Sequence, residues 1–315
     1  MHMRLLPVVA FTLVLAACGR GSEQQAAAPT ETDAAPAASG NVYEFKIGEF
    51  TAYALKDSTF VIPNDGKVFG INRTPEDIAK VLSEAGLPTT ELTLSVQPML
   101  VKTADKVLLF DTGVGPGGGE NNGKLLVSMS EAGIDPASVT DIFISHGHFD
   151  HVGGLVDANG ALVFANATVR MSAAEWDSIK GSVGDDAGRK AMVEAVTPKI
   201  ETFAPGSELI PNIVKAVEIK GHTPGHSGYL ITSGNESLLY MGDTAHHYIV
   251  SVREPDWTIQ FDGDAPTAQA SRKEVLATYA QSGQRIYAVH FPFPGLGKFV
   301  NEGEHFAWAA EQPGE

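Results

Sequence analysis

The chain has 315 residues, of which 43% are apolar and 19% are charged, and its formal net charge is −16. This composition can fill a hydrophobic core and argues against a disordered chain. The excess of acids argues against nucleic acid as the main partner, because neutralising phosphates requires clustered Lys and Arg. A single cysteine excludes an internal disulfide framework and a zinc site built from cysteines.

The N-terminus has the organisation of an export signal. Arg4 precedes an apolar run over residues 5–17, which is too short to cross a bilayer as a helix. Residues 15–18 resemble a bacterial lipobox, in which the cysteine, here Cys18, is lipidated and becomes the first mature residue. An ordinary signal peptide with an incidental cysteine is the alternative. Because Gly19 and not Asp follows the cysteine, we expect a lipid anchor in the outer membrane, facing the periplasm.

Residues 18–40 are predicted to form a disordered tether rich in Ala and Pro. After Cys18 this stretch contains no aromatic residue and no Val, Ile, Leu or Met. It therefore cannot bury enough apolar surface to offset the entropy lost on ordering. We expect one folded domain over residues 41–315, with the folded part beginning near Val42.

In the predicted domain, short apolar runs bounded by Gly, Asp or His alternate with helical patterns. Runs typical of strands covered on both faces lie at residues 107–110, 142–144, 238–241 and 286–289. Thr74 and Pro75 mark the start of one helix, and Ser172 with Glu175 forms a capping box before another. A third helix is predicted after Pro266. The pattern indicates sheets covered by helices.

Most of the histidines lie in short motifs that follow these apolar runs. His146, His148, Asp150 and His151 come directly after the run at 142–144. Neutral imidazole and carboxylate are the ligands that suit zinc and related divalent ions. A surface histidine cluster is the alternative, but three imidazoles and a carboxylate so close behind a buried strand favour a metal site.

Further motifs follow in the same order along the chain: residues 221–227 with His222 and His226, residues 242–246 with Asp243 and His246, and His290. Together with the turn at residues 110–113, they resemble the motifs of the metallo-β-lactamase superfamily. The resemblance implies an α/β fold built as a four-layer αββα sandwich. Each candidate ligand follows a strand, so all would gather at one edge of the sheets, by analogy with open α/β folds.

The resemblance implies a site for two divalent metal ions, with zinc as the expected metal. It assigns the ligands as follows: His146, His148 and His226 to the first ion, Asp150, His151 and His290 to the second, and Asp243 as the bridge. The residues alone do not choose between His222 and His226. The family pattern favours His226 and leaves His222 beside the ligands or at a strand end.

Carried over to this chain, the resemblance implies a hydrolase in which a hydroxide bridging the metal ions attacks an ester. The catalytic residues would be Asp150, Asp243 and His246. In many acyl-homoserine lactonases of the superfamily, a Tyr that contacts the substrate carbonyl stands at the position of His246. We expect His246 either to take this role as a donor or proton shuttle, or to support the ligands. We expect an apolar substrate pocket lined by four aromatic residues that flank the ligands in sequence: Phe149, Phe261, Phe291 and Phe293.

Three segments resemble one branch of the superfamily more specifically, the branch that includes methyl parathion hydrolase-like enzymes and lactonases. These segments are residues 242–243, 259–262 and 290–295. The preferred substrate is a small-molecule lactone, either an acyl-homoserine lactone or an aryl lactone, or an ester. An organophosphate triester is the alternative, and a β-lactam is disfavoured. A binding protein with a degenerate site is disfavoured because every expected ligand is present. The sequence leaves open whether the chain forms a homodimer. Membrane contact is expected only through Cys18.

Overall fold

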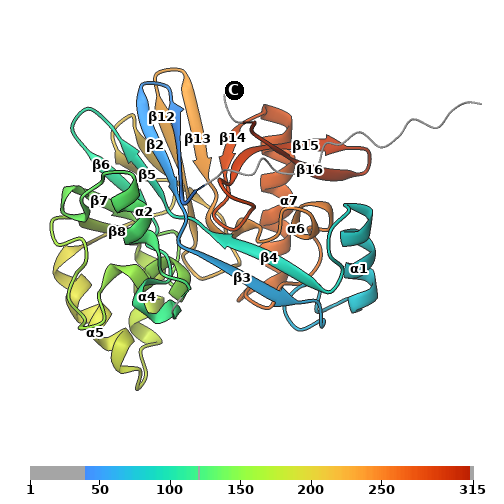
Figure 1. Cartoon of the computed structure of the whole chain (residues 1–315), viewed down its shortest axis with the longest axis horizontal. Helices are drawn as coiled ribbons and strands as arrows, with labels where there is room; N and C mark the ends of the chain where they lie inside the picture. The colour runs from blue at the N-terminus through green and yellow to red at the C-terminus, as the bar shows by residue number, and fades with distance from the viewer. Residues whose placement is uncertain (1–39, 120, 313–315) are drawn as a thin grey trace, which may run out of the picture. The chain divides into compact units, whose positions relative to one another are not determined.

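The structure, a computed structural model, describes residues 40–119 and 121–312. The predicted signal peptide and the predicted tether up to residue 39 lie outside the described residues. The described strands form two sheets of seven strands each and one sheet of two strands (Figure 1). No helix in the described ranges has both the length and the apolar character needed to cross a membrane.

The first sheet has the strand order β1-β2-β5-β6-β7-β8-β9. Its strands are β1 Val42–Ile47, β2 Phe50–Leu55, β5 Met99–Lys102, β6 Val107–Phe110, β7 Asp141–Phe143, β8 Thr168–Ser172 and β9 Ile200–Phe203. Pairing is antiparallel from β1 to β6 and parallel from β6 to β9. The parallel half carries the loop from β7 that holds the first histidine motif.

The second sheet has the strand order β10-β11-β12-β13-β14-β15-β16. Its strands are β10 Glu208–Ile210, β11 Val214–Glu218, β12 Ser227–Ser233, β13 Glu236–Tyr240, β14 Arg285–Tyr287, β15 Leu296–Glu302 and β16 His305–Ala310. Only β13 and β14 are parallel to each other. The predicted apolar runs therefore correspond to β6, β7, β13 and β14. Three of these strands, β7, β13 and β14, precede ligand motifs, whereas the motif at residues 221–227 follows β11.

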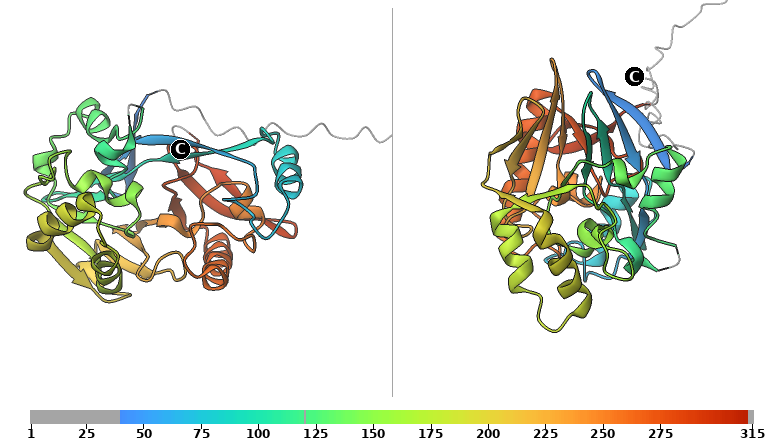
Figure 2. Two further views of the ribbon diagram at one scale, coloured as in Figure 1. Left: turned by 90° about the horizontal axis from the view of Figure 1, so that it is seen from below. Right: turned by 90° about the vertical axis from the view of Figure 1, so that its left-hand side faces the viewer.

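Four of the helices cover the outer faces of the two large sheets (Figure 2). The described helices are α1 Pro75–Glu84, α2 Leu125–Glu131, α3 Phe149–Val152, α4 Ala173–Gly181, α5 Ala187–Val196, α6 Val250–Arg253 and α7 Ala265–Ser282. The described 3₁₀ turns are η1 Gly115–Gly118, η2 Pro136–Ser138, η3 Gly153–Leu155, η4 Thr197–Lys199 and η5 Gly242–Thr244. Helices α2, α4 and α5 pack on the first sheet, and α7 packs on the second. Aromatic side chains from both sheets, including Phe110 and Tyr240, fill the space between them. These layers form the predicted αββα sandwich.

A hairpin of β3 (Ser58–Pro63) and β4 (Glu91–Val96) lies outside both sheets. It carries α1 between its strands, and α1 begins as predicted, with Thr74 and Asp77 capping each other. Leu92 and Leu94 pack with α1 and α6 in a separate apolar cluster. The Ser95 amide donates to the His290 carbonyl at 3.1 Å, which ties the hairpin to the loop after β14. The hairpin thus reaches the ligand motifs.

Candidate active site

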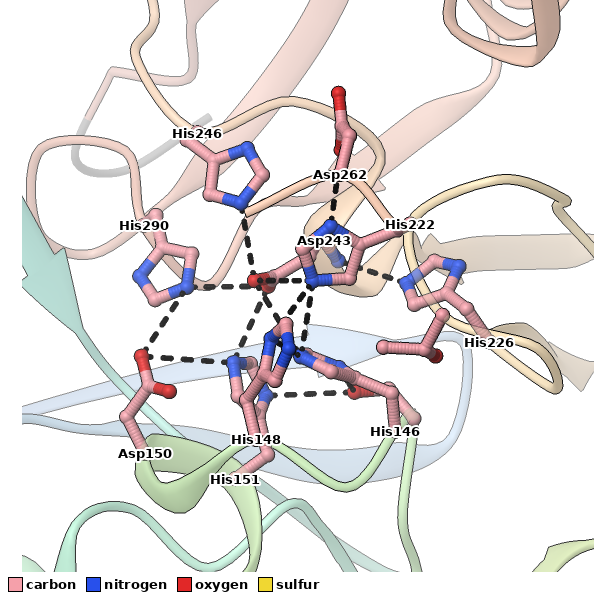
Figure 3. Close-up of polar contacts among 12 residues, drawn as sticks. His146, His148, Asp150, His151, His222, His226, Asp243, His246, Asp262 and His290 are labelled. Atoms are coloured by element: carbon pink, nitrogen blue, oxygen red, sulfur yellow. Dashed lines mark hydrogen bonds and ion pairs between the residues drawn. The ribbon is translucent and has the colours of Figure 1, made fainter. Parts of the chain in front are cut away.

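The first metal group comprises His146, His148 and His222 with Asp243. Loops after β7 and β11 carry the histidines, whose ring nitrogens converge (Figure 3). The His146 Nε2 lies 2.9 Å from the His148 Nδ1, and the His222 Nε2 lies 3.1 and 3.0 Å from these two atoms. Three imidazoles held around one point are a ligand set for a divalent metal ion.

The second metal group comprises Asp150, His151 and His290. The Asp150 Oδ2 lies 3.7 Å from the His151 Nε2 and 3.6 Å from the His290 Nε2. Asp150 and His151 belong to α3, the single helical turn that starts after His148, whereas His290 follows β14. The second group is therefore assembled from both sheets.

Asp243 lies between the two groups, and its two carboxylate oxygens face different histidines. Its Oδ1 is 3.2 Å from the His151 Nε2 and 3.1 Å from the His290 Nε2. Its Oδ2 is 3.6 Å from the His146 Nε2 and 3.3 Å from the His222 Nε2. The carboxylate therefore lies where it could bridge two metal positions, which is the role that the resemblance implies for Asp243.

The prediction of His226 as a metal ligand is wrong, and His222 takes its place. The His226 Nδ1 donates to the Ile219 carbonyl at 3.0 Å, and its Nε2 accepts from the Asp243 amide at 2.9 Å. Both ring nitrogens are thereby occupied, and burial lowers the pKa of His226 to about 3. His226 instead fixes the backbone of the bridging residue.

Three ligand histidines donate their Nδ1 hydrogen and so keep Nε2 free for a metal ion. His151 donates to the Asp111 Oδ2 at 2.7 Å, and His222 donates to the Asp262 Oδ1 at 3.0 Å. His290 donates to the Ser95 carbonyl at 2.8 Å. Partners of this kind fix both the tautomer and the ring orientation of metal-binding histidines.

Buried polar atoms in the site lack partners within the protein. Among the described residues, the His151 Nε2 and the Asp243 Oδ1 are buried without a hydrogen bond. Such atoms are costly unless something satisfies them, and a divalent cation held by the second group would do so. Burial lowers the pKa of His146 well below its usual value and that of His148 to about 4, which keeps both rings in the neutral, ligating form. The residues present therefore fit two divalent metal ions.

His246 lies beside both groups without belonging to either. Its Nε2 is 3.2 Å from the Asp243 Oδ2, and its ring stacks on that of His290 with centroids 5.6 Å apart. Neither ring nitrogen has a hydrogen-bond partner among the described residues. Phe69 and Phe261 flank the ring at 6.4 and 5.8 Å, so His246 stands where the polar site meets an apolar wall.

The four phenylalanines predicted to line the pocket divide into two pairs. Phe149 is 61% exposed and Phe261 is 38% exposed, and both stand next to the site. Phe291 is fully buried against Trp308 in the core, so its predicted contact with substrate is wrong. Phe293 lines a separate cavity of about 250 Å³ together with His247.

Glu175 has a larger role than the capping box predicted from the sequence. Ser172 does accept the Glu175 amide at 3.2 Å, but the Glu175 carboxylate does not return to the cap. It accepts the amides of Gly147 and Gly225 and the Thr223 hydroxyl, each at 2.8 Å. This buried carboxylate thereby joins the two loops that carry the first metal group.

Arg272 and Asp262 were also missed as supports of the site. The Arg272 Nη2 lies 2.7 Å from the Asp262 Oδ2 in a fully buried ion pair. Burial alone would raise the pKa of Asp262, but the hydrogen bond from His222 and the charge of Arg272 lower it to about 2. Asp262 lies in the motif at residues 259–262, but no local sequence pattern links this residue to His222.

A model of the metallo-beta-lactamase superfamily matches residues 93–279. The chain belongs to this superfamily. It is 30% identical to an N-acyl homoserine lactonase from Bacillus sp over 46% of the chain, and it spans 61% of that relative. The match therefore covers less than two thirds of the relative.

Solved structures in the superfamily match over greater lengths. A dizinc quorum-quenching lactonase, AidC, in complex with a product, matches with a TM-score of 0.80 and 30% identity. That match covers 86% of this chain and 98% of the neighbour. The hydrolase AbOPH matches with a TM-score of 0.78 and 25% identity, over 87% of this chain and 98% of the neighbour. The superfamily and its fold are confirmed, whereas the parathion hydrolase-like branch is not.

Proposed function

We propose that this protein is a metal-dependent lactonase that hydrolyses the ring ester of N-acyl homoserine lactones. The observation that carries the proposal is the Asp243 carboxylate, which faces a histidine group on each side. The similarity to a dizinc lactonase over 86% of the chain supports both the metal and the substrate. Zinc suits this set of imidazoles and carboxylates.

The two groups of ligands would hold two divalent ions, which would lower the pKa of a bound water toward neutrality and polarise a carbonyl oxygen. The protein must then position the ring ester and supply a proton to the leaving alkoxide. His246 borders the site where the ring ester would bind, because its Nε2 is 3.2 Å from the Asp243 Oδ2 and neither ring nitrogen has a hydrogen-bond partner among the described residues. Burial lowers the pKa of His246, so the ring is neutral at pH 7 and offers one N–H as a hydrogen-bond donor to a substrate oxygen.

Apolar surface beside the site supports a substrate with an acyl chain. Phe149 contacts Phe60 of β3 with ring centroids 6.1 Å apart, and Phe261 lies across His246. Large exposed aromatic side chains at the edge of a polar site are typical of ligand contacts. No described contact favours a phosphotriester or a β-lactam over a lactone.

The test is hydrolysis by the full-length zinc-loaded protein, with acid release followed for N-decanoyl homoserine lactone and for an aryl phosphotriester. We expect lactone hydrolysis to be faster by at least about a hundredfold in kcat/KM, which corresponds to about 2.7 kcal/mol of differential transition-state stabilisation. Asp243→Ala is the negative control. Equal or faster phosphotriester cleavage would contradict the proposal.

We also propose that the protein is exported and lipid-anchored through Cys18. The apolar run at residues 5–17 and the position of the single cysteine directly after it support this. The test is mass spectrometry of the mature N-terminus after expression in a Gram-negative host. We expect a lipidated Cys18, and we expect Cys18→Ser to shift the protein from the membrane fraction to the soluble fraction. An unmodified Cys18 would contradict the anchor.

A further inference from the structure

His290, a ligand of the second metal group, lies in a loop and not in a strand or helix. The loop at residues 288–295 connects β14 to β15. Within it, the hydrogen bond that spans His290 runs from the Phe291 amide to the Ala288 carbonyl and is long, at 3.4 Å. Such a bond is weak, so contacts from other elements matter for the direction of the His290 ring.

The side chain of Gln97 holds both ends of this turn. Gln97 directly follows β4 and is fully buried. Its Nε2 donates to the Ala288 carbonyl at 3.0 Å and to the Phe291 carbonyl at 2.9 Å. A side-chain amide has two N–H donors, so both are used, one on each side of His290.

The loop leaves room for this side chain, and the side chain is not the cheapest one for the core. Gly295 has a φ of +77°, and a Cβ on it would collide with the Gln97 Nε2 and the Ala288 carbonyl. The Gln97 Oε1 is buried without a hydrogen-bond partner among the described residues. A buried acceptor without a donor is costly, and an apolar side chain would avoid this cost. The two bonds from Nε2 therefore indicate a role in the turn itself.

Attachment of the β3–β4 hairpin to the loop does not require the Gln97 side chain. The backbone already joins them, because the Ser95 amide donates to the His290 carbonyl at 3.1 Å. The Gln97 amide also donates to the Val289 carbonyl at 3.2 Å. The side chain adds bonds to the two carbonyls on either side of this pair, which are the ends of the turn that carries the ligand.

We propose that Gln97 is a positioning residue that fixes the direction of His290 toward the second metal group. The inference deepens the proposed function and rests on its metal-dependent part. The two bonds from Gln97 set the backbone of the turn from which the His290 ring extends. The His290 Nε2 then lies 3.1 Å from the Asp243 Oδ1 (Figure 3).

A merely structural role for Gln97 predicts a different result. Loss of a buried hydrogen bond would lower the stability of the whole fold and affect the two metal groups alike. Loss of a positioning contact would lower the zinc affinity of the second group, to which His290 belongs, and spare the first group.

The experiment measures zinc affinity by chelator competition in the full-length protein, separately for the two groups. A His222→Ala background isolates the second group, and a His290→Ala background isolates the first. Gln97→Met removes both donors and keeps the length of the side chain. Gln284→Met is the matched control, because the Gln284 Nε2 also donates to two backbone carbonyls, at 2.9 and 3.1 Å, at the ends of β13 and β14 away from the ligands. Thermal unfolding is measured for each variant.

We expect Gln97→Met to lower the zinc affinity of the second group about 10–100-fold and that of the first group less than about threefold, as is typical when a group that orients one ligand is lost. Gln284→Met should leave both affinities unchanged. Gln97→Glu keeps the shape of the side chain and at most one donor, so it should show a smaller fall at the same group. It replaces Gln97→Met if that variant does not fold.

An unchanged affinity of the second group, or an equal fall in both groups, overturns the inference and leaves the lactonase function standing. Because the test reads zinc affinity, a wild type that binds zinc without hydrolysing lactones contradicts the proposed function and leaves the role of Gln97 standing. A wild type that binds no zinc overturns both.

Discussion

In each metal group one histidine is hydrogen-bonded to a buried carboxylate, and the two carboxylates are stabilised in different ways. Asp262 holds His222 of the first group and pairs with the Arg272 guanidinium at 2.7 Å. Asp111 holds His151 of the second group and has no Arg or Lys among its described partners. It accepts instead from the Ser145 amide, the Ser145 hydroxyl and the Tyr240 hydroxyl, each at 2.7 Å.

This difference predicts unequal sensitivity of the two groups. Removing the cation of a buried ion pair leaves an uncompensated charge, at a cost of about 3–5 kcal/mol. Removing one neutral donor from a network leaves the remaining donors in place, at a cost of about 1–2 kcal/mol. We therefore expect the first group to depend on one residue, Arg272, and the second to tolerate single losses around Asp111.

The largest effect is expected from Asp243→Ala, which removes the bridge and damages both groups at once. Lactone hydrolysis should fall by at least about a thousandfold, since the metal ions supply several kcal/mol of transition-state stabilisation. Bound zinc, measured by elemental analysis of the purified protein, should fall below two ions per chain. Asp177→Asn, an exposed carboxylate paired with Lys180 at 2.8 Å, is the control. Two retained ions in Asp243→Ala would refute the bridge.

The next effect separates the two candidate histidines of the loop at residues 221–227. We expect His222→Ala to lose one zinc ion, because its Nε2 faces the first group. His226→Ala should retain two ions and lose stability, since the Asp243 amide then lacks its acceptor. The measurement is zinc stoichiometry beside chemical unfolding. The reverse pattern, with the ion lost in His226→Ala, would restore the original assignment.

The strand-associated ligands could be predicted from sequence because each motif is local and follows a buried run. His222 and His226 could not be distinguished, because the choice depends on how the loop packs. Gly225 lies so close to Ser172 and to the Glu175 backbone that a Cβ there would collide with them. This packing turns His226 toward Ile219 and leaves His222 facing the first group.

Supports that come from distant parts of the chain left no local signal. Arg272 lies 50 positions after His222 on α7, and its face of that helix could not be known before the helix was docked. The β3–β4 hairpin was not predicted either, although its Ser95 carbonyl orients His290. Local sequence motifs therefore indicated most of the candidate ligands, and the family resemblance indicated the layers, whereas tertiary packing determines which groups orient the ligands.

Arg272→Met tests the dependence of the first group on its ion pair. We expect zinc affinity at that group to fall about 10–100-fold, as is typical when a partner of a ligand histidine is lost. Chelator competition in a His290→Ala background isolates the first group for this measurement. Arg272→Lys should restore part of the affinity because it returns the charge to Asp262. Unchanged affinity in Arg272→Met would show that Asp262 orients His222 without its cation.

The smallest effect is expected from Tyr240→Phe, the corresponding change at the second group. Burial and the Asp111 charge raise the pKa of Tyr240 well above its usual value, so the hydroxyl remains a donor that the variant removes. The free energy of unfolding should fall by about 1–2 kcal/mol. Zinc affinity of the second group, isolated in a His222→Ala background, should fall less than about threefold, because Asp111 keeps its bonds to Ser145 and His151.

Tyr229→Phe is the matched control for this change, because its buried hydroxyl donates to the Ile144 carbonyl and not to a carboxylate. It should lose similar stability and leave zinc affinity unchanged. If Tyr240→Phe weakened the second group as much as Arg272→Met weakens the first, the neutral network would be no more tolerant than the ion pair. The two groups would then be equally sensitive, and the manner in which each carboxylate is neutralised would not determine how firmly its histidine is held.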